Sequence, residues 1–304
     1  MKELSAKQQW AMEKMAELCA SSESQEEACK QVGISSGVYT PIKKGTYTGN
    51  VDNQLKKLIE YFENKEAASE LNFSSGYKNT SISTQICKAL KLCQLKGGMT
   101  IISGDAGIGK TKACRHFYEE NSRSTILIEA NTYLKSQRTI LELIGEQLGV
   151  ALTSSAKMWQ HITAKLSDGM IIIIDEAQHL TGSTIDGVRS FCDVFNERGQ
   201  TLGLALVGNP SIYQKIQKAG FEQLDNRVKN DFQFGVKKLK ASDIQLIFPQ
   251  IANDKASVEF MLRVAQTKQG LRGAENLFLN ALDAEDISCR GLANEAKKIS
   301  GLVI

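Results

Sequence analysis

The sequence predicts an α/β protein, in which a core with a mainly parallel sheet follows an all-α domain and precedes a helical lid. From Ser81 onward, short apolar runs alternate with segments of helical periodicity, which is typical of a parallel sheet covered on both faces. Before about residue 65 and after about residue 240, the periodicity is helical only. We therefore expect domains at residues 1–65, 66–240 and 241–304.

The core is expected to contain four buried strands, because four short runs of aliphatic residues are bounded by polar residues or glycine. A polar segment rich in serine and asparagine, residues 63–81, is expected to be a linker. The expected strands are residues 99–103, 124–130, 169–175 and 202–208. The expected helices are residues 5–20, 24–33, 51–64, 82–93, 110–120, 137–149, 155–167, 183–198, 242–251, 257–267, 270–284 and 292–299.

The first domain contains two short helical patterns joined through Gly33, which predicts a helix-turn-helix. Ser24 followed by Glu27 has the spacing of a capping box, and the second helix would begin near Ser35 or Ser36. In a DNA-binding motif of this kind, the second helix enters the major groove. A plain helical domain for dimerisation or docking is the alternative. The side chains expected to face DNA are those of Ser36, Tyr39, Thr40, Lys43 and Lys44.

The run ISGDAGIGKTKA, residues 102–113, has the P-loop spacing G-x-x-x-x-G-K-[ST] and lies between an expected strand and an expected helix. Glycines allow successive backbone N–H groups to point at a phosphate chain, and the start of the helix adds a positive end. Lys110 would neutralise the β- and γ-phosphates of ATP. The residues expected to contact the nucleotide are Gly104, Asp105, Ala106, Gly107, Ile108, Gly109, Lys110, Thr111 and Lys112.

Acidic and amide side chains follow two of the other expected strands. The run MIIIID is followed by a second acid, so Asp175 and Glu176 end one strand, and Asn209 follows another. The carboxyl ends of parallel strands lie beside the phosphate loop. We expect Asp175 to hold Mg²⁺ with the hydroxyl of Thr111, Glu176 to polarise the attacking water, and Asn209 to hold that water near the γ-phosphate. The predicted cofactors are ATP and Mg²⁺.

Together these motifs resemble those of the AAA+ ATPases, with GDAGIGKT as Walker A, IIIIDE as Walker B and VGNP as sensor 1. The resemblance implies two further residues. Arg227, in FEQLDNRVKNDF, would complete the active site of a neighbouring subunit. Arg272, in GLRGAENLFLNAL, would be the sensor-2 arginine that contacts the nucleotide from the lid. For each arginine the alternative is a surface charge or a local ion pair.

The order of domains, together with VGISSGVYTPIKKGTYTGN and GNPSIY, is similar to that of the MuB-type transposition ATPases and of their TnsC-type and IstB-type relatives. The resemblance implies a homo-oligomer, a helical filament or a ring, that assembles with ATP on double-stranded DNA. It would present that DNA to a transposase, and ATP hydrolysis would control its disassembly.

In AAA+ assemblies the loops after the second strand and after Walker B face the central channel, which would put Lys135, Ser136, Arg138, Thr181 and Ser183 near DNA phosphates. Helix capping would explain the polar residues without DNA. For the small basic run of Lys237, Lys238 and Lys240, a solvated surface is the favoured interpretation.

Composition limits the class of protein but does not identify its binding partner. A net charge of +3 is too small to indicate nucleic-acid binding, so any DNA-binding surface would be local. Seven scattered cysteines without a C-x-x-C pair are typical of reduced thiols, and no aliphatic run is long enough to span a bilayer. We therefore expect a cytoplasmic protein with no membrane partner. Two alternative functions are a helicase-loading ATPase and a transcription regulator that uses ATP only as a ligand.

Overall fold

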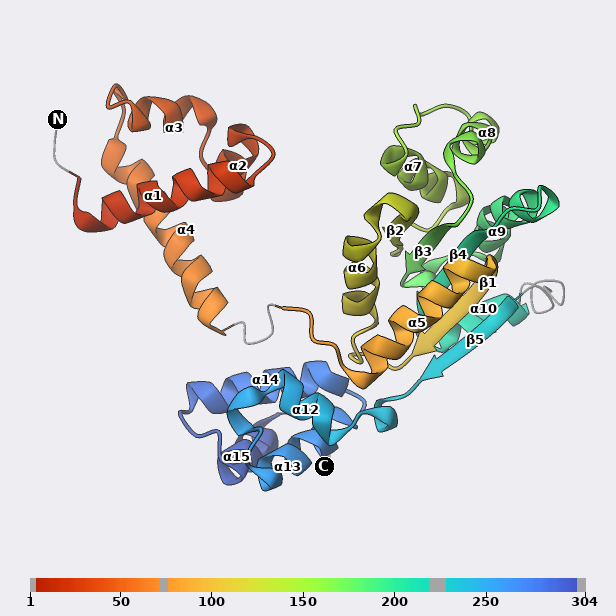
Figure 1. Ribbon diagram of the computed structural model, residues 1–304. Coiled ribbons are helices and arrows are strands. Elements are labelled where there is room, and N and C mark those ends of the chain that lie inside the picture. The colour runs from red at the N-terminus through yellow and green to blue at the C-terminus, as the bar shows by residue number, and fades with distance from the viewer. Residues whose placement is uncertain (1–3, 72–75, 219–227, 300–304) are drawn as a thin grey trace. The chain divides into compact units, whose positions relative to one another are not determined.

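The computed structural model describes residues 4–71, 76–218 and 228–299, with side chains for residues 4–66, 76–214 and 228–299. The chain divides into two compact units, Met1–Ser75 and Gly76–Ile304, which are described one at a time (Figure 1). They are called here the helical unit and the P-loop unit. None of the helices in the described residues combines the length and the apolar character that crossing a bilayer requires.

The helical unit consists of α1 (Ala6–Ser21), α2 (Gln25–Val32), α3 (Ser36–Lys43) and α4 (Val51–Leu71). Ser24 caps α2, because its hydroxyl accepts a hydrogen bond from the Glu27 amide at 3.2 Å. Gly33 then ends α2 with φ 76°, a left-handed conformation that favours glycine. A compact apolar core holds the helices together; it includes Ala11, Met15, Ala28, Val32, Ile34, Tyr39, Ile42, Leu55, Leu58 and Phe62.

Two expectations for this unit are wrong. Helix α4 continues to Leu71, so the expected linker from residue 63 is helical over its first part, which is rich in good helix formers. The Tyr39 side chain is only 1% exposed. It packs inside the core instead of facing DNA, because its large ring lies on the apolar side of α3, next to Ile42.

The P-loop unit is built on a five-stranded parallel sheet with strand order β2-β3-β4-β1-β5. The predicted α/β fold class is therefore confirmed. Its strands are β1 (Gly98–Gly104), β2 (Thr125–Glu129), β3 (Met170–Asp175), β4 (Leu202–Gly208) and β5 (Val228–Phe234). The helices that accompany them are α5 (Ser81–Lys96), α6 (Lys110–Glu120), α7 (Gln137–Gln147), α8 (Ser155–Lys165), α9 (Gly182–Glu197) and α10 (Ser211–Lys218).

Helices cover both faces of the sheet, and alternate side chains of each strand enter different cores. Ile171 and Ile173 of β3 pack into one core together with α5, α6 and the lid. Ile172 and Ile174, their neighbours along the strand, enter a second core with α7, α8 and α9. Because both faces are covered, β3 and β4 read in the sequence as uninterrupted aliphatic runs.

The edge strand β5 is the one strand that the sequence did not predict. Its residues VKNDFQF alternate between exposed and partly buried positions, and only Phe234 at its end is fully buried. An edge strand of this kind lacks the apolar run that marks the central strands. Because of polar residues such as Lys229 and Asp231, the sequence did not predict a strand here, although β5 pairs with β1 from Met99 to Gly104.

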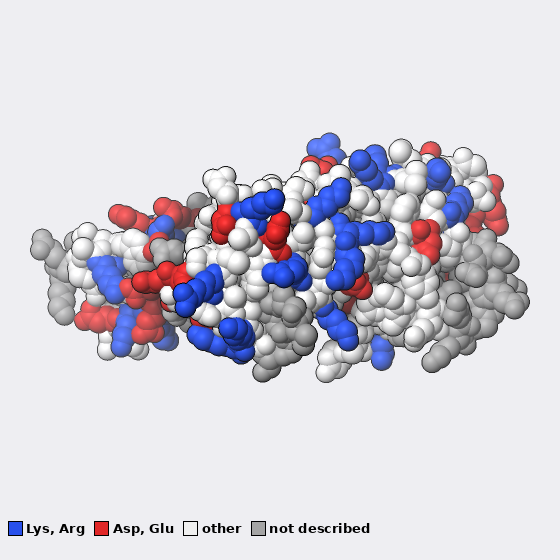
Figure 2. Space-filling model, turned by 90° about the horizontal axis from the view of Figure 1, so that it is seen from below, with Lys and Arg blue, Asp and Glu red and all other residues white. Residues whose placement is uncertain are grey.

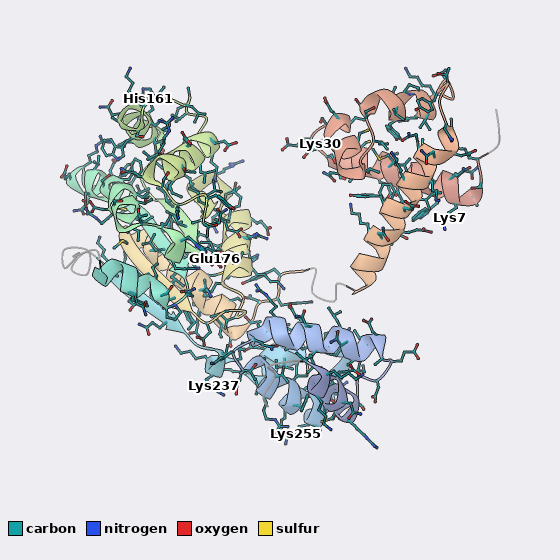
Figure 3. All side chains as sticks on the ribbon, turned by 180° about the vertical axis from the view of Figure 1, so that it is seen from behind. Lys7, Lys30, His161, Glu176, Lys237 and Lys255 are labelled. Atoms are coloured by element: carbon teal, nitrogen blue, oxygen red, sulfur yellow. The ribbon has the colours of Figure 1, made fainter. Side chains whose placement is uncertain are left out.

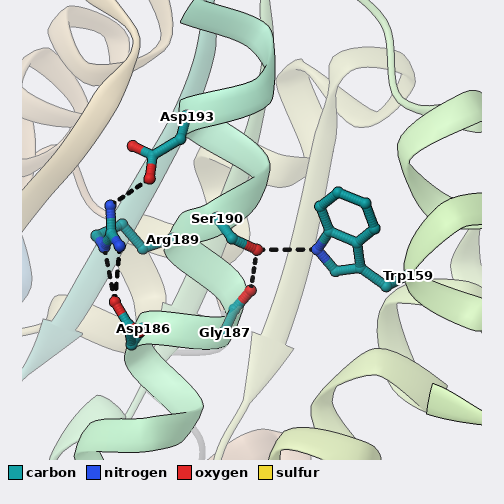
Figure 4. Close-up of polar contacts among 6 residues, drawn as sticks. All are labelled: Trp159, Asp186, Gly187, Arg189, Ser190 and Asp193. Carbon is teal, nitrogen blue, oxygen red and sulfur yellow. Dashed lines mark hydrogen bonds and ion pairs between the residues drawn. The ribbon is translucent and has the colours of Figure 1, made fainter. Parts of the chain in front are cut away.

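Helices α8 and α9 are fastened by a polar cluster on the second face of the sheet (Figure 4). The Trp159 indole N–H donates to Ser190 Oγ at 2.9 Å, and the Trp159 ring stacks on Phe191. Along α9, Arg189 bonds Asp186 at 2.7 Å and Asp193 at 2.5 Å. This cluster ties α8 to α9 and pairs the charges along one side of α9.

The lid contains α12 (Ala241–Ile247), α13 (Lys255–Ala265), α14 (Gly270–Asp283) and α15 (Cys289–Lys298), as the sequence predicted. Its apolar residues, among them Phe248 and Phe278, share one continuous core with α5 and α6. The buried carboxylate of Asp243 joins the two ends of this assembly. It accepts hydrogen bonds from the Ser81 amide and hydroxyl, at 2.7 and 2.6 Å, and from the Lys240 amide at 2.9 Å.

The seven cysteines are free thiols. Burial raises the pKa of Cys93 to about 11 and the pKa of Cys192 to about 12. Burial also raises the pKa of Cys114 well above its ordinary value. A thiol with so high a pKa carries almost no thiolate at neutral pH, so these three cysteines serve as apolar core residues.

Candidate nucleotide-binding site

The glycine-rich loop runs from the end of β1 to the start of α6. Gly107 and Gly109 have φ values of 72° and 93°, a region in which a side chain would be strained. Asp105 anchors the loop to the end of β5, since its amide donates to the Phe234 carbonyl at 3.1 Å and its carboxylate accepts from the Val236 amide at 2.9 Å. Ile108 is fully buried beneath the loop, so only its backbone can reach a phosphate.

Lys110, the first residue of α6, lies inside the loop. Its Nζ donates hydrogen bonds to the carbonyls of Gly104 at 2.9 Å and Asp105 at 2.8 Å, and the residue is 8% exposed. Burial lowers the pKa of the ammonium group, while the carboxylates of Asp175 and Glu176 act in the opposite direction. A cation held in this way is positioned for an anion that enters the loop.

Asp175 ends β3 beside the first turn of α6. It is 2% exposed, its Oδ1 accepts from the Glu176 amide at 2.9 Å, and the Thr111 hydroxyl is a hydrogen-bond partner. Burial raises the pKa of this carboxyl group, although the hydrogen bonds from Thr111 and Glu176 oppose the rise. Within the described residues, Asp175 Oδ2 is buried without a hydrogen-bond partner.

A divalent cation fits this arrangement. A buried carboxylate oxygen without a hydrogen-bond partner is rare in proteins, and a hard cation bound to that oxygen would explain it. Mg²⁺ takes one or two carboxylates together with hydroxyl and phosphate oxygens, which is the donor set that Asp175 and Thr111 begin. Among the described residues, no group of three or more His, Cys, Asp or Glu side chains is placed to hold a metal by itself. A cation at Asp175 would therefore need ligands from a nucleotide.

Glu176 follows with φ 53°, an unusual left-handed backbone for a residue other than glycine. Its Oε2 accepts a hydrogen bond from Gln178 Nε2, and Glu176 lines the same cavity as the loop. Asn209, after β4, donates its backbone N–H to Gln178 Oε1 at 3.2 Å. The Asn209 Oδ1 caps α10 through the Ser211 amide and hydroxyl, at 2.9 and 2.5 Å, so the Nδ2 end of the amide is left to serve as a donor.

Lys110, Thr111 and Glu176 meet at a cavity of about 340 Å³, within the size range of small-ligand sites. The lid closes one side, because the Leu271 amide donates to the Gly107 carbonyl at 2.9 Å. A Cβ at Gly270 would lie 2.6 Å from the Ala106 carbonyl oxygen, so loop and lid touch backbone to backbone. Figure 3 labels Glu176 in the P-loop unit. The cavity is lined by Ala106, Gly107, Gly109, Lys110, Thr111, Lys112, Glu176, Leu271, Arg272 and Glu275.

Comparisons with known proteins agree with this geometry. The family model described as an AAA domain matches residues 94–216. The ORC2 protein of Aeropyrum pernix shares the fold with a TM-score of 0.54 and 16% identity, over 76% of this chain and 72% of its own. CDC6P from Pyrobaculum aerophilum does so with a TM-score of 0.53 and 16% identity, over 75% and 70%. Residues 94–216 are therefore similar to an AAA domain, and the two solved structures show that the fold is shared.

Curated relatives extend the likeness to most of the chain. The Mu-like prophage FluMu DNA transposition protein B of Haemophilus influenzae is 27% identical over 82% of this chain and 88% of its own length. The ATP-dependent target DNA activator B of Escherichia phage Mu is 24% identical over 82% and 81%. The resemblance to the MuB-type ATPases is thereby confirmed.

Of the residues predicted for the nucleotide site, the structure brings together the glycine-rich loop, Thr111, Asp175 and Glu176. Arg272 reaches the same cavity from the first turn of α14. Lys112 also lines it, and its Nζ lies 3.2 Å from Glu275 on the lid. Asn209 lies at the end of the neighbouring strand, linked to Glu176 through Gln178. Arg227 falls outside the described residues.

The loops expected to face DNA lie side by side, since the Thr184 hydroxyl donates to the Lys135 carbonyl at 2.9 Å. The Ser136 hydroxyl caps α7 and the Thr181 hydroxyl caps α9, so capping accounts for these two residues. Arg138 bonds Glu142 at 2.8 Å. Lys135 is exposed, and on the same loop Tyr133, which the sequence did not single out, is 90% exposed.

The remaining basic candidates lie on surfaces. Lys43 and Lys44 are exposed at the end of α3, Ser36 is half-buried, and the Thr40 hydroxyl accepts from the Gln25 side chain at 2.9 Å. Lys238 lies over the Phe234 ring and donates to the Gln233 carbonyl at 2.6 Å. In the view of Figure 2, lysine and arginine side chains lie close together near the middle, with acidic side chains among them.

Sequence reasoning missed two residues of the site. Gln178 stands two positions after Glu176, and nothing in DEAQHL shows that its amide turns back to the acid. Gly270 is the first residue of α14 and has φ 63°, directly against Ala106 and Gly107. This glycine begins the run GLRGAEN, where helical periodicity starts, and it was a usable signal for a close backbone approach.

Proposed function

We propose that this chain is an ATP-dependent target-DNA activator, which assembles on double-stranded DNA and directs a transposase to it. The observation that carries the proposal is the likeness to transposition proteins B, because it spans 82% of this chain and more than four fifths of each relative. The likeness to ORC2 and CDC6P concerns the fold alone and does not favour a helicase loader.

In this proposal the loop amides around Gly107 bind the phosphates, and Lys110 moves its hydrogen bonds from the loop carbonyls to the β- and γ-phosphate oxygens. Thr111 and Asp175 would hold Mg²⁺, which would neutralise charge on the phosphate oxygens. Phosphoryl transfer depends mainly on positioning and charge stabilisation. Glu176 polarises the attacking water, and the Asn209 amide nitrogen helps to orient it.

Assembly would complete the site. Arg272 contacts the nucleotide from the lid, and Arg227 of one subunit acts on the nucleotide of its neighbour. Hydrolysis is therefore slow in an isolated subunit and rises on assembly, and it releases the oligomer from DNA. DNA phosphates would be bound by the loops that carry Lys135 and Arg138, with a second contact from Lys43 and Lys44 of a helix-turn-helix in the helical unit.

The test measures ATP turnover per subunit against protein concentration, with and without duplex DNA, together with electron microscopy of the same samples. We expect turnover to rise with both variables and ATP-bound protein to coat the DNA. Lys110→Ala should remove both effects by abolishing nucleotide binding, measured by calorimetry. A rate per subunit that is independent of concentration and of DNA would contradict the proposal.

A further inference from the structure

Gln178 lies in the short turn Ala177–His179 that follows β3, between the ends of β3 and β4. It is 8% exposed, and both ends of its side-chain amide form hydrogen bonds within the protein. Its Nε2 donates to Glu176 Oε2, and its Oε1 accepts from the backbone N–H of Asn209 at 3.2 Å. One buried amide therefore bridges the acidic residue of one strand end and the backbone of the next.

The orientation of this amide is fixed by its partners. A backbone N–H can only donate a hydrogen bond, and an ionised carboxylate can only accept one. Rotating the Gln178 amide by half a turn would set oxygen against carboxylate and NH₂ against N–H, so both bonds would be lost together. Of the natural side chains of this length, only glutamine satisfies both partners at once.

The surrounding backbone is shaped to admit the bridge. A Cβ at Gly208, the last residue of β4, would collide with Gln178 Oε1. Glu176 is held at φ 53°, a strained backbone that turns its side chain into the cavity lined by the P-loop. Strain of this kind persists only where neighbouring contacts maintain it, and it is concentrated at functional sites.

We propose that Gln178 is a positioning residue, which fixes the Glu176 carboxylate in the nucleotide cavity and couples it to the strand end that carries Asn209. The bond to Oε2 leaves Glu176 Oε1 to face the attacking water. A shift of β4 at Asn209 would be transmitted through Gln178 to the carboxylate. The inference rests on the proposed role of Glu176 in polarising that water.

The experiment compares Gln178→Ala, Gln178→Glu and Gly208→Ala in the full chain with Mg²⁺, ATP and duplex DNA. The ATP dissociation constant and the maximal turnover rate are measured separately. We expect each variant to lower turnover about tenfold while the dissociation constant changes less than twofold, because Gln178 orients the base without touching the nucleotide. Gln178→Glu keeps an acceptor for Asn209 but places a like charge beside Glu176, so it should be at least as slow as Gln178→Ala.

Gln94→Ala is the matched control, since Gln94 is also buried, at 4% exposure, and donates to Ser124 and Gly169 far from the phosphate loop. It should keep the turnover rate. Gln178→Ala is also combined with Glu176→Ala, and the pair should be no slower than Glu176→Ala alone. Turnover of Gln178→Ala equal to that of Gln94→Ala, or a further loss in the pair, would overturn the inference. Unchanged turnover in Glu176→Ala would instead overturn the proposed role of Glu176. Gly208→Ala decides the matter if Gln178→Ala does not fold.

Discussion

The two units of this chain treat charge differently. In the described part of the helical unit, every buried side chain is hydrophobic, and the charged groups form exposed pairs such as Lys7–Glu63 and Lys14–Glu66. In the P-loop unit, Lys110 and Asp175 are buried with shifted pKa values. Burying a charge is costly, and it occurs where hydrogen bonds satisfy the group, as they do for Asp243, or where a functional site requires it. Lys110 and Asp175 belong to the second case, because they lie together at the candidate nucleotide site of the P-loop unit.

The two units also differ in net charge. Residues 1–75 contain nine lysines, no arginine and eleven acidic residues, whereas the rest of the chain holds 28 basic and 23 acidic residues. A helical unit with excess negative charge gains little from non-specific attraction to DNA. In the proposed function, any DNA contact of the helical unit would come from a local group such as Lys43 and Lys44, and most of the affinity for DNA would come from the P-loop unit.

The largest effect should follow Glu176→Gln, which removes the negative charge and keeps the shape. We expect turnover to fall by about a hundredfold with ATP affinity preserved, since one catalytic base is lost and the phosphate contacts are kept. The ATP-bound protein should then stay on duplex DNA, measured as its dissociation rate after excess competitor DNA is added. Glu63→Gln, which affects an exposed pair in the helical unit, is the matched control and should leave turnover unchanged.

Gly270→Ala should have the next largest effect, because it places a Cβ 2.6 Å from the Ala106 carbonyl at a φ of 63°. We expect a loss of about 2–3 kcal/mol in the free energy of unfolding and weaker ATP binding. Gly149→Ala is the control, since Gly149 has φ 65° but no atom within 4 Å of its Cβ. Denaturant unfolding of both variants separates the cost of the backbone conformation, which both variants share, from the cost of the steric clash, which only Gly270→Ala has. Equal losses in the free energy of unfolding would show that loop and lid are not in close contact.

Lys135→Ala tests where DNA affinity resides. If Lys135 contacts a phosphate, the slope of log affinity against log salt should decrease by about one, with a severalfold loss of affinity at fixed salt. Lys43→Ala with Lys44→Ala in the helical unit gives the comparison. A larger change of slope from the helical pair than from Lys135 would reverse the assignment of DNA affinity to the P-loop unit.

The smallest effect is expected from Asp175→Asn in the protein without nucleotide. Because burial raises the pKa of Asp175 in the folded state, the folded protein holds its proton more tightly than the unfolded chain. The free energy of unfolding therefore falls as pH rises from below the unfolded pKa through the folded pKa, and the loss is fully present above it. Asp175→Asn should raise the melting temperature by about 2–4 °C at neutral pH. No rise in melting temperature at neutral pH, or an equal rise below pH 3, would contradict the predicted direction of the pH dependence.

The sequence predicted the central strands because each is buried on both faces and so consists of aliphatic residues almost throughout. The same property located Asp175, Glu176 and Asn209, since a polar residue that ends such a run lies at the carboxyl edge of the sheet. β5 was not predicted because its residues alternate between exposed and partly buried positions, whereas β2, the other edge strand, is mostly buried and was predicted. Tyr39 was misplaced because periodicity alone did not decide which side of a short, mixed helix faces the core.

Some contacts between distant segments followed from the sequence, since the end of β3 was expected beside the P-loop and Asp175 meets Thr111 there. The Gln178 bridge and the meeting of Gly107 with Gly270 depend on how the ends of strands and helices approach one another. Residue spacing gives neither the direction of the Gln178 side chain nor the segment that approaches Gly270. The sequence therefore predicted which side chains belong to the candidate nucleotide site. The residues that hold those side chains in place, such as Gln178, were found only in the structure.

The close approach of Gly107 and Gly270 bears on the order in which this protein matures. The two glycines are far apart along the chain, yet their backbones pack so closely that a Cβ on either one would meet atoms of the other segment. Non-local contacts of this kind form late, because the intervening chain must first be ordered. The lid helices follow all five strands in the chain, so during synthesis the nascent protein should acquire its sheet before the contact between loop and lid can form.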